Sequence, residues 1–176
     1  QSSTGFNQVV MTPTPPMATR HEIIANTGGV SPLDPYGGFP IYPPDGSNFA
    51  IKLGSDLDYP GDIMPMARAE RASYIINVPS TGGDFALTYQ YAVVLQSPDT
   101  LSHPWNQQPR FTITVYDQNG LPVSGPCGTY SVLASSASLD PSYVFFATSL
   151  NASDPTVGGY YKPWTTVSID LSPYVG

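Results

Sequence analysis

Residues 160–176 read YYKPWTTVSIDLSPYVG, and this stretch decides the fold class. After Trp164, apolar and polar residues alternate from Thr166 to Leu171, which is the period-2 pattern of a half-buried β-strand. Leu-Ser-x-Tyr-x-Gly then forms a turn at residues 171–176. The stretch therefore predicts a strand that begins at Trp164, with the indole in the core, and ends in a tight turn.

The same pattern recurs along most of the chain. Residues 85–95 form the longest predicted strand, and because both of its faces become apolar towards its end we expect it to be central in a sheet. The sequence DQNG at 117–120 is a strong hairpin signal. The full set of expected strands is 49–53, 73–78, 85–95, 111–116, 121–123, 129–134, 143–149 and 164–171, with a short helical turn at 64–72. Short strands separated by turn residues predict an all-β, antiparallel β-sandwich of the jelly-roll type.

Composition agrees with this fold class. Pro (20) and Gly (16) are abundant, which favours turns over long helices, and 12 Tyr and 7 Phe favour strands. Charged residues are only 11%, against about 25% in a typical soluble domain. The polar surface must therefore come from Ser, Thr, Asn and Gln, a pattern common in extracellular β proteins.

The first 46 residues differ from the rest. They contain eight prolines and the pairs Gly28-Gly29 and Gly37-Gly38, so the segment is too broken for regular core strands. We expect an irregular, extended N-terminal arm at 1–46 and one β-domain at 47–176.

Charge and hydropathy exclude several classes of partner. The net charge of −7, without any cluster of Lys or Arg, argues against nucleic acid and against an anionic membrane surface. The longest apolar run, Tyr91–Leu95, is far shorter than the ~18 residues of a membrane span, so we expect no membrane insertion. A chain that begins at Gln1 fits a secreted protein after removal of its signal peptide. The lone Cys127 has two interpretations: a cysteine whose disulfide partner lies elsewhere, or a small buried apolar residue.

The sequence favours a protein that is not an enzyme. The only histidines are His21 and His103, and no Ser lies in a nucleophile elbow, so a catalytic triad is not indicated. No spacing of acidic residues selects a carboxylate pair for glycoside hydrolysis. We expect no cofactor.

One acidic loop is a candidate calcium site. Asp56, Asp58 and Asp62 provide oxygen ligands around a Pro-Gly turn. An EF-hand is excluded, because Pro60 replaces a third ligand and Ala67 stands where the Glu would be. A loop-bound calcium and an ordinary acidic turn both remain open.

Aromatic and imidazole side chains in or beside loops are the candidate ligand contacts. Flat rings give a large contact area at low entropic cost, which suits sugar faces and protein partners alike. The candidate ligand-binding residues are Trp105, His103, Tyr160, Tyr161 and Tyr42.

Three segments together resemble a jelly-roll domain of large Bacteroidota cell-surface proteins, which use type IX secretion and are described as gliding-motility-associated or adhesin-like. The segments are 85–111 with YQYAVVLQSP and QPRF, 111–127 with VYDQNG and GPC, and 161–176. Residues 48–54, NFAIKLG, fit that family's first core strand, so the resemblance covers about residues 40–176.

The resemblance has three further implications. In the family another strand follows the turn at 173–176 and carries a late Cys, so Cys127 would lack its disulfide partner and the final strands would be absent here. Another chain or segment would then complete the sheet by β-strand addition. Asp99-Thr100-Leu101 also resembles the O-glycosylation pattern of secreted Bacteroidota proteins, with Thr100 as the acceptor.

These observations favour a non-catalytic, extracellular or bacterial cell-surface binding module of adhesin type, which binds glycan or protein through loop aromatics. The first alternative is a structural subunit of a surface assembly, completed by strand or arm exchange. The second is a carbohydrate-binding ancillary domain of a polysaccharide-degrading enzyme.

Overall fold

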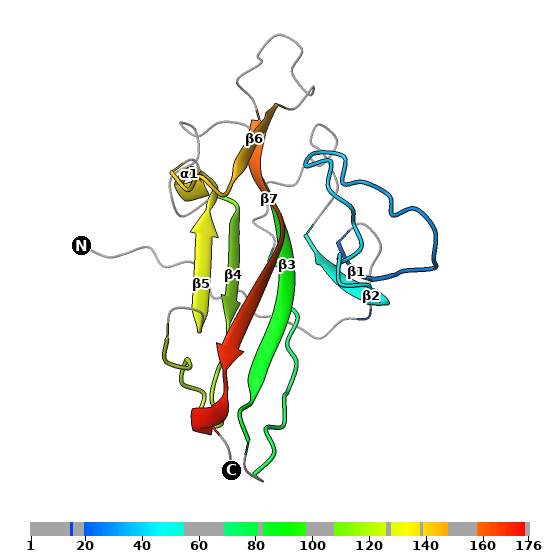
Figure 1. Ribbon diagram of the computed structural model, residues 1–176. Coiled ribbons are helices and arrows are strands. Elements are labelled where there is room, and N and C mark those ends of the chain that lie inside the picture. Colours follow the sequence, from blue (N-terminus) through cyan, green and yellow to red (C-terminus); the bar gives the residue numbers. More distant parts are fainter. Residues whose placement is uncertain are drawn as a thin grey trace, which may run out of the picture.

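The computed structural model describes residues 15, 20–54, 69–80, 83–97, 108–125, 128–137, 139–147 and 158–174. Within these ranges the fold is mostly β, with small antiparallel sheets and one short α-helix (Figure 1). The elements are β1 (His21–Ala25), β2 (Phe49–Leu53), β3 (Ala86–Ser97), β4 (Arg110–Thr114), β5 (Thr129–Leu133), α1 (Ala134–Ala137), β6 (Val144–Ala147), β7 (Gly158–Asp170) and a 3-10 turn, η2 (Ser172–Tyr174). The antiparallel β class is confirmed; the jelly-roll topology stays a prediction.

The largest sheet has the strand order β3-β7-β6, with β7 in the centre. β7 begins six residues before the predicted start at Trp164, because a β-bulge absorbs Pro163. Tyr91 pairs with Thr165 and Val93 with Lys162, so the extra residue lies on β7. Proline has no N–H to give to the ladder, and a bulge is one of the few places where a strand tolerates it.

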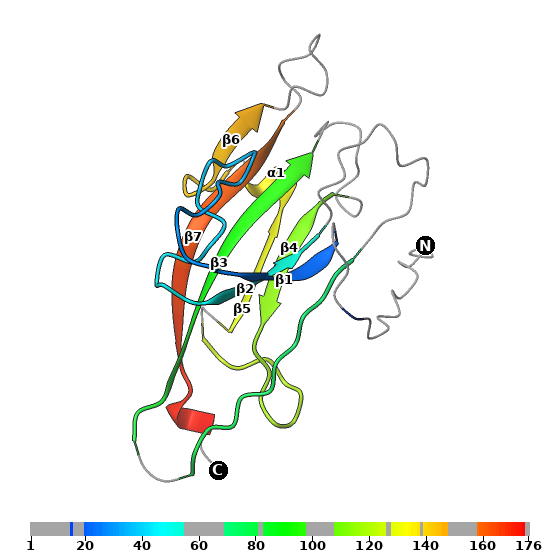
Figure 2. The same ribbon diagram turned by 90° about the vertical axis from the view of Figure 1, so that its right-hand side faces the viewer.

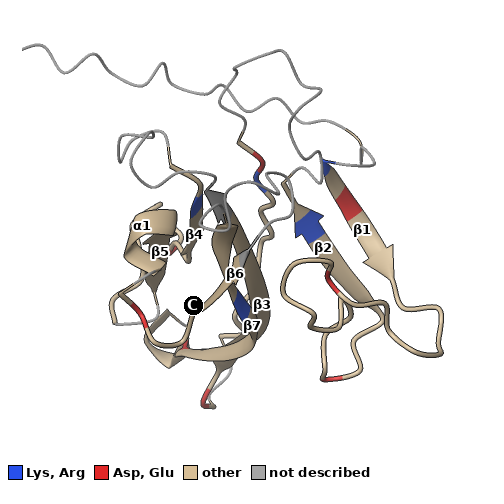
Figure 3. Ribbon diagram, turned by 90° about the horizontal axis from the view of Figure 1, so that it is seen from above, with Lys and Arg blue, Asp and Glu red and all other residues tan. Residues whose placement is uncertain are grey.

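The main core lies between this sheet and the β4–β5 pair. Side chains from the odd-numbered positions of β3 meet Val132 of β5 and the two small residues Ala134 and Ala137 of α1. The buried members are Tyr91, Val93, Leu95, Val132, Ala134, Ala137 and Tyr143. Seen from above, β4, β5 and α1 lie on one side of the β3–β7–β6 sheet and the β1–β2 ribbon on the other (Figure 3).

A second, smaller cluster lies where β7 ends. Val123, Ile169 and Leu171 are buried there, and Val78, Phe85 and Tyr174 are among the side chains that pack around them. The cluster brings the end of β7 together with the loop that follows β4.

Lys162 of β7 lies close to three tyrosine rings, one from β3, one from β5 and one from the residue before β6. Its Nζ lies 5.3 Å from the ring centre of Tyr143, 5.6 Å from that of Tyr130 and 5.9 Å from that of Tyr91. The hydroxyls of Tyr130 and Tyr143 are hydrogen-bonded at 2.7 Å. Burial raises the pKa of Tyr91 and of Tyr143, so both hydroxyls stay protonated at neutral pH.

The sequence prediction of a central position for residues 85–95 is wrong within the described part of the chain. β3 pairs with β7 alone and therefore lies at the edge of its sheet. Its second apolar face has a different cause: Val94 pairs with Tyr161, whose ring packs 6.0 Å from that of Phe39 in the N-terminal arm. A loop, and not a second neighbouring strand, covers that face.

One local prediction fails, because residues 73–78 form no strand. Of the predicted helical turn at 64–72, only 69–72 lie among the described residues, and these are not helical. Residues 121–123 do return antiparallel to 115–117, but as an isolated bridge between Tyr116 and Pro122 and not as a full strand. The predicted strand 129–134 ends one residue early, at Leu133, because α1 begins at Ala134. Ala134 and Ala137 are 0% and 1% exposed, and such small side chains let the helical turn sit directly on the core.

Among its described residues, 15 and 20–46, the N-terminal arm contains one strand. β1 pairs with β2 in a two-stranded ribbon, with Ile23 opposite Ile51, and contributes nothing to either core cluster. None of the helices in the described ranges has the length and apolar character needed to cross a bilayer.

Candidate functional site

The two tyrosines of β7 in the predicted ligand set do not form one surface. Tyr160 and Tyr161 are neighbours in β7, so their side chains point to opposite faces of the sheet. Tyr160 packs edge-on against Phe145 at 5.6 Å, whereas Tyr161 packs against Phe39. Tyr42 is half-buried in the arm, and its backbone N–H donates to Ser31 Oγ at 3.1 Å. A single flat ligand therefore cannot stack on Tyr160 and Tyr161 together.

Trp164 is partly buried but belongs to neither core cluster, so its predicted core position is wrong. Its indole Nε1–H donates to the carbonyl oxygen of Pro40 at 2.7 Å. In the same region the ring of Tyr36 lies 5.3 Å from that of Phe146. The indole thus fastens the N-terminal arm onto the β6–β7 side of the sheet.

The remaining predicted site residues lie outside the described residues. These are Trp105 and His103 of the ligand set, Asp56, Asp58 and Asp62 of the calcium loop, Thr100 and Cys127. Within the ranges that the structure does describe, no group of three or more His, Cys, Asp or Glu side chains could hold a metal ion. Both the calcium and the disulfide predictions stay predictions.

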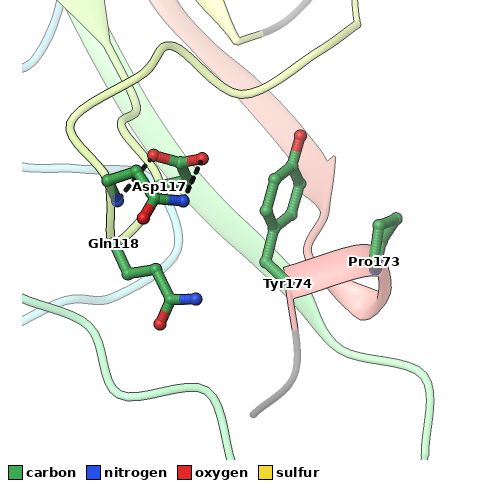
Figure 4. Close-up of a pocket in the computed structure, with 5 residues that line it drawn as sticks. Asp117, Gln118, Pro173 and Tyr174 are labelled. Carbon is green, nitrogen blue, oxygen red and sulfur yellow. Dashed lines mark hydrogen bonds between the residues drawn. The ribbon is translucent and has the colours of Figure 1, made fainter.

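A hollow of about 250 Å³ lies where β7 ends, between two turns that are far apart in sequence (Figure 4). One wall is the turn after β4, and the other is η2. The lining residues are Asp117, Gln118, Asn119, Pro173 and Tyr174.

The first wall is a rigid turn. Asp117 Oδ1 accepts hydrogen bonds from the backbone N–H groups of Asn119 and Leu121, both at 2.9 Å. Gly120 supplies the positive φ of 76° that the turn requires. The hydrogen bond from Leu121 is the largest of several that lower the pKa of Asp117, so this carboxylate stays ionised at neutral pH.

The second wall is held through Tyr174. Its hydroxyl accepts a hydrogen bond from the backbone N–H of Ser124 at 2.8 Å, and its ring packs against the Val123 cluster. Gln118, by contrast, is exposed and makes no hydrogen bond within the described residues. The hollow therefore combines fixed walls with an amide that is able to bind a ligand.

The chemistry of this hollow suits a small, neutral, polar ligand. The amides of Gln118 and Asn119 donate and accept hydrogen bonds, and Tyr174 contributes an aromatic ring. Sequence reasoning identified both turns but not their proximity, because more than fifty residues separate them.

A second charged cluster lies at the start of β1. Glu70 accepts hydrogen bonds from Arg20 and from His21 Nδ1, the latter at 2.8 Å. His21 Nε2 lies 2.9 Å from the carbonyl oxygen of Pro15. These contacts tie the start of β1 to Glu70.

Comparison with known families, curated proteins and solved structures gives no match to this chain.

Proposed function

We propose that this chain is a non-catalytic, extracellular binding module of adhesin type that takes a neutral carbohydrate in the hollow between the 117–120 turn and η2. The main support for the proposal is that one hollow contains both the side-chain amide of Gln118, which makes no hydrogen bond within the described residues, and the aromatic ring of Tyr174. The low content of charged residues and the resemblance to adhesin-like surface proteins also support it.

The size of the hollow indicates what it would bind. Pockets for drug-sized ligands measure roughly 300–1,000 Å³, so a hollow of about 250 Å³ would hold a smaller ligand, which we take to be one or two sugar rings. Hydroxyl groups of a sugar would hydrogen-bond to Gln118 and Asn119, and one face of the ring would lie against Tyr174.

The test is binding to an array of neutral mono- and oligosaccharides, followed by calorimetry on each sugar that binds. Gln118→Ala should weaken binding about tenfold, the value of one hydrogen bond of about 1.4 kcal/mol. Val30→Ala is the matched control, because Val30 is 98% exposed and lies in the arm. Its affinity should equal that of the unchanged chain.

Two results would contradict the proposal. One is the absence of any sugar that binds. The other is binding that Trp105→Ala abolishes while Gln118→Ala leaves it intact, which would move the ligand to the loop identified from the sequence.

A further inference from the structure

Residues 73–78 have the sequence of a strand but pair with no strand among the described residues. The segment reads SYIINV, with Tyr74, Ile76 and Val78 alternating with Ser73, Ile75 and Asn77. Tyr74 is 90% exposed, Ile75 85% and Ile76 42%. The backbone of 73–78 forms no hydrogen bond within the described part of the chain. Figure 2 shows this segment, in green-cyan, running down the molecule without joining a sheet.

The edge of β3 is the complementary feature. β3 has twelve residues and lies at the edge of its sheet in the described structure. Proteins usually protect such an edge with Lys, Pro or a short length, but Ala86–Ser97 contains no charged residue and no proline. The strand is also held firmly, since Tyr91, Val93 and Leu95 are 8%, 4% and 4% exposed. It is a long, rigid and unprotected template for another strand.

The alternation of side chains in residues 73–78 can be aligned with the two faces of β3. The odd-numbered side chains of β3 point into the core, and its polar face carries Thr88 and Gln90, which bond to β7 hydroxyls. An antiparallel strand with Ile75 opposite Gln90 would place Tyr74, Ile76 and Val78 on the core side, and Val78 would then leave the second cluster of its own chain for the same cluster of the second copy. Ser73, Ile75 and Asn77 would lie on the polar face, as the period of two requires.

We propose that residues 73–78 of one copy add to the outer edge of β3 in a second copy, and that the exchange is reciprocal. In the part of the chain that the structure describes, each copy carries both a strand-like segment without a pairing strand and an edge strand without a second neighbour, so a two-fold dimer pairs both features at once. A strand from an unrelated protein would pair the edge but leave residues 73–78 exposed. The inference does not depend on the proposed sugar site, which lies at the end of β7.

Mixed disulfide cross-linking tests this arrangement. Two variants, Ile75→Cys and Gln90→Cys, are made in a Cys127→Ser background, mixed in equal amounts and oxidised. We expect a covalent dimer from the mixture and none from either variant alone. The double variant carrying both cysteines, oxidised in dilute solution, should give no intrachain disulfide.

The competing arrangement is a hairpin in which residues 73–78 fold back on β3 of the same chain. An intrachain disulfide in the dilute double variant would establish that hairpin and overturn the proposal. A mixture without any covalent dimer would overturn it as well.

Sedimentation velocity of the chain with its native cysteine gives an independent readout. Ile76→Lys should weaken dimer formation at least tenfold, because it places a charge on the core side of the added strand. Ile75→Lys is the matched control, one residue away on the opposite face, and should still form the dimer. Equal effects of the two substitutions, or a monomer at every concentration, would contradict the proposal.

Discussion

Residues 164–170 and residues 73–78 both have a strand-like pattern but differ in structure. Val167 and Ile169 alternate with Ser168 and Asp170 in the first segment, and in the second Tyr74, Ile76 and Val78 occupy every second position. Residues 164–170 lie in β7, paired on one side with β3, and Ile169 is 5% exposed. Residues 73–78 pair with no strand in the described ranges, and Ile75 is 85% exposed. Alternation thus predicts the capacity to form a strand, but a partner decides whether the strand forms.

The largest expected effect compares the two isoleucines directly. Ile169→Ala should lower the free energy of unfolding by about 2–5 kcal/mol, because it opens a cavity in the cluster with Val123 and Leu171. Ile75→Ala should change it by less than about 0.5 kcal/mol in dilute solution. Urea denaturation of both variants measures the difference, and similar losses would mean that residues 73–78 are packed.

A second comparison concerns the lysines of the core and of the ribbon. Lys162→Met should cost about 1–2 kcal/mol, because the ammonium group lies over three tyrosine rings. Lys52→Met is the control: its Nζ lies 3.8 Å from Glu22 Oε1 near the surface, and such pairs contribute about 0.2–1 kcal/mol. If thermal unfolding showed Lys52→Met to be the more damaging change, the tyrosine contacts would not stabilise β7.

A third test examines the contact between the N-terminal arm and β7. Residues 73–78 have no such contact with the arm among the described residues. Trp164→Phe removes the indole N–H that donates to Pro40 while keeping an aromatic ring. We expect a loss of about 1 kcal/mol and faster proteolysis within residues 36–41. An unchanged cleavage rate would show that the aromatic contacts of Tyr36 and Phe39 hold the loop without this hydrogen bond.

The smallest effect is the pH dependence of the turn that lines the hollow. Hydrogen bonds lower the pKa of Asp117 in the folded chain below the ordinary value of 3.8, which applies to the unfolded chain. The ionised carboxylate therefore contributes its full stabilisation of the fold above pH 3.8. This stabilisation is lost as the pH falls through the lower pKa of the folded chain. Asp117→Asn should therefore be less stable than the unchanged chain at pH 5, with a difference that shrinks towards pH 2. A difference that is constant with pH would contradict this assignment.

Sequence reasoning located most strands but not their neighbours. The period of two and the turn residues were sufficient for β2, β3, β4 and β5, whose cores lie within the predicted ranges. They failed where tertiary structure decides: at Pro163, which a bulge accommodates, at Ala134, where a helical turn fits the core, and at residues 73–78. The hollow at Gln118 and Tyr174 could not be predicted from the sequence, because its two turns come together only in the folded chain.

Amide hydrogen exchange at two protein concentrations tests the central claim most directly. Those amides of 165–170 that bond to β3 should be protected at both concentrations, because β7 is paired within one copy. The amides of 73–78 should all exchange rapidly in dilute solution, and those that would bond to β3 of a second copy should become protected when the protein is concentrated enough for strand exchange. Protection of 73–78 in dilute solution, or rapid exchange at both concentrations, would contradict the account.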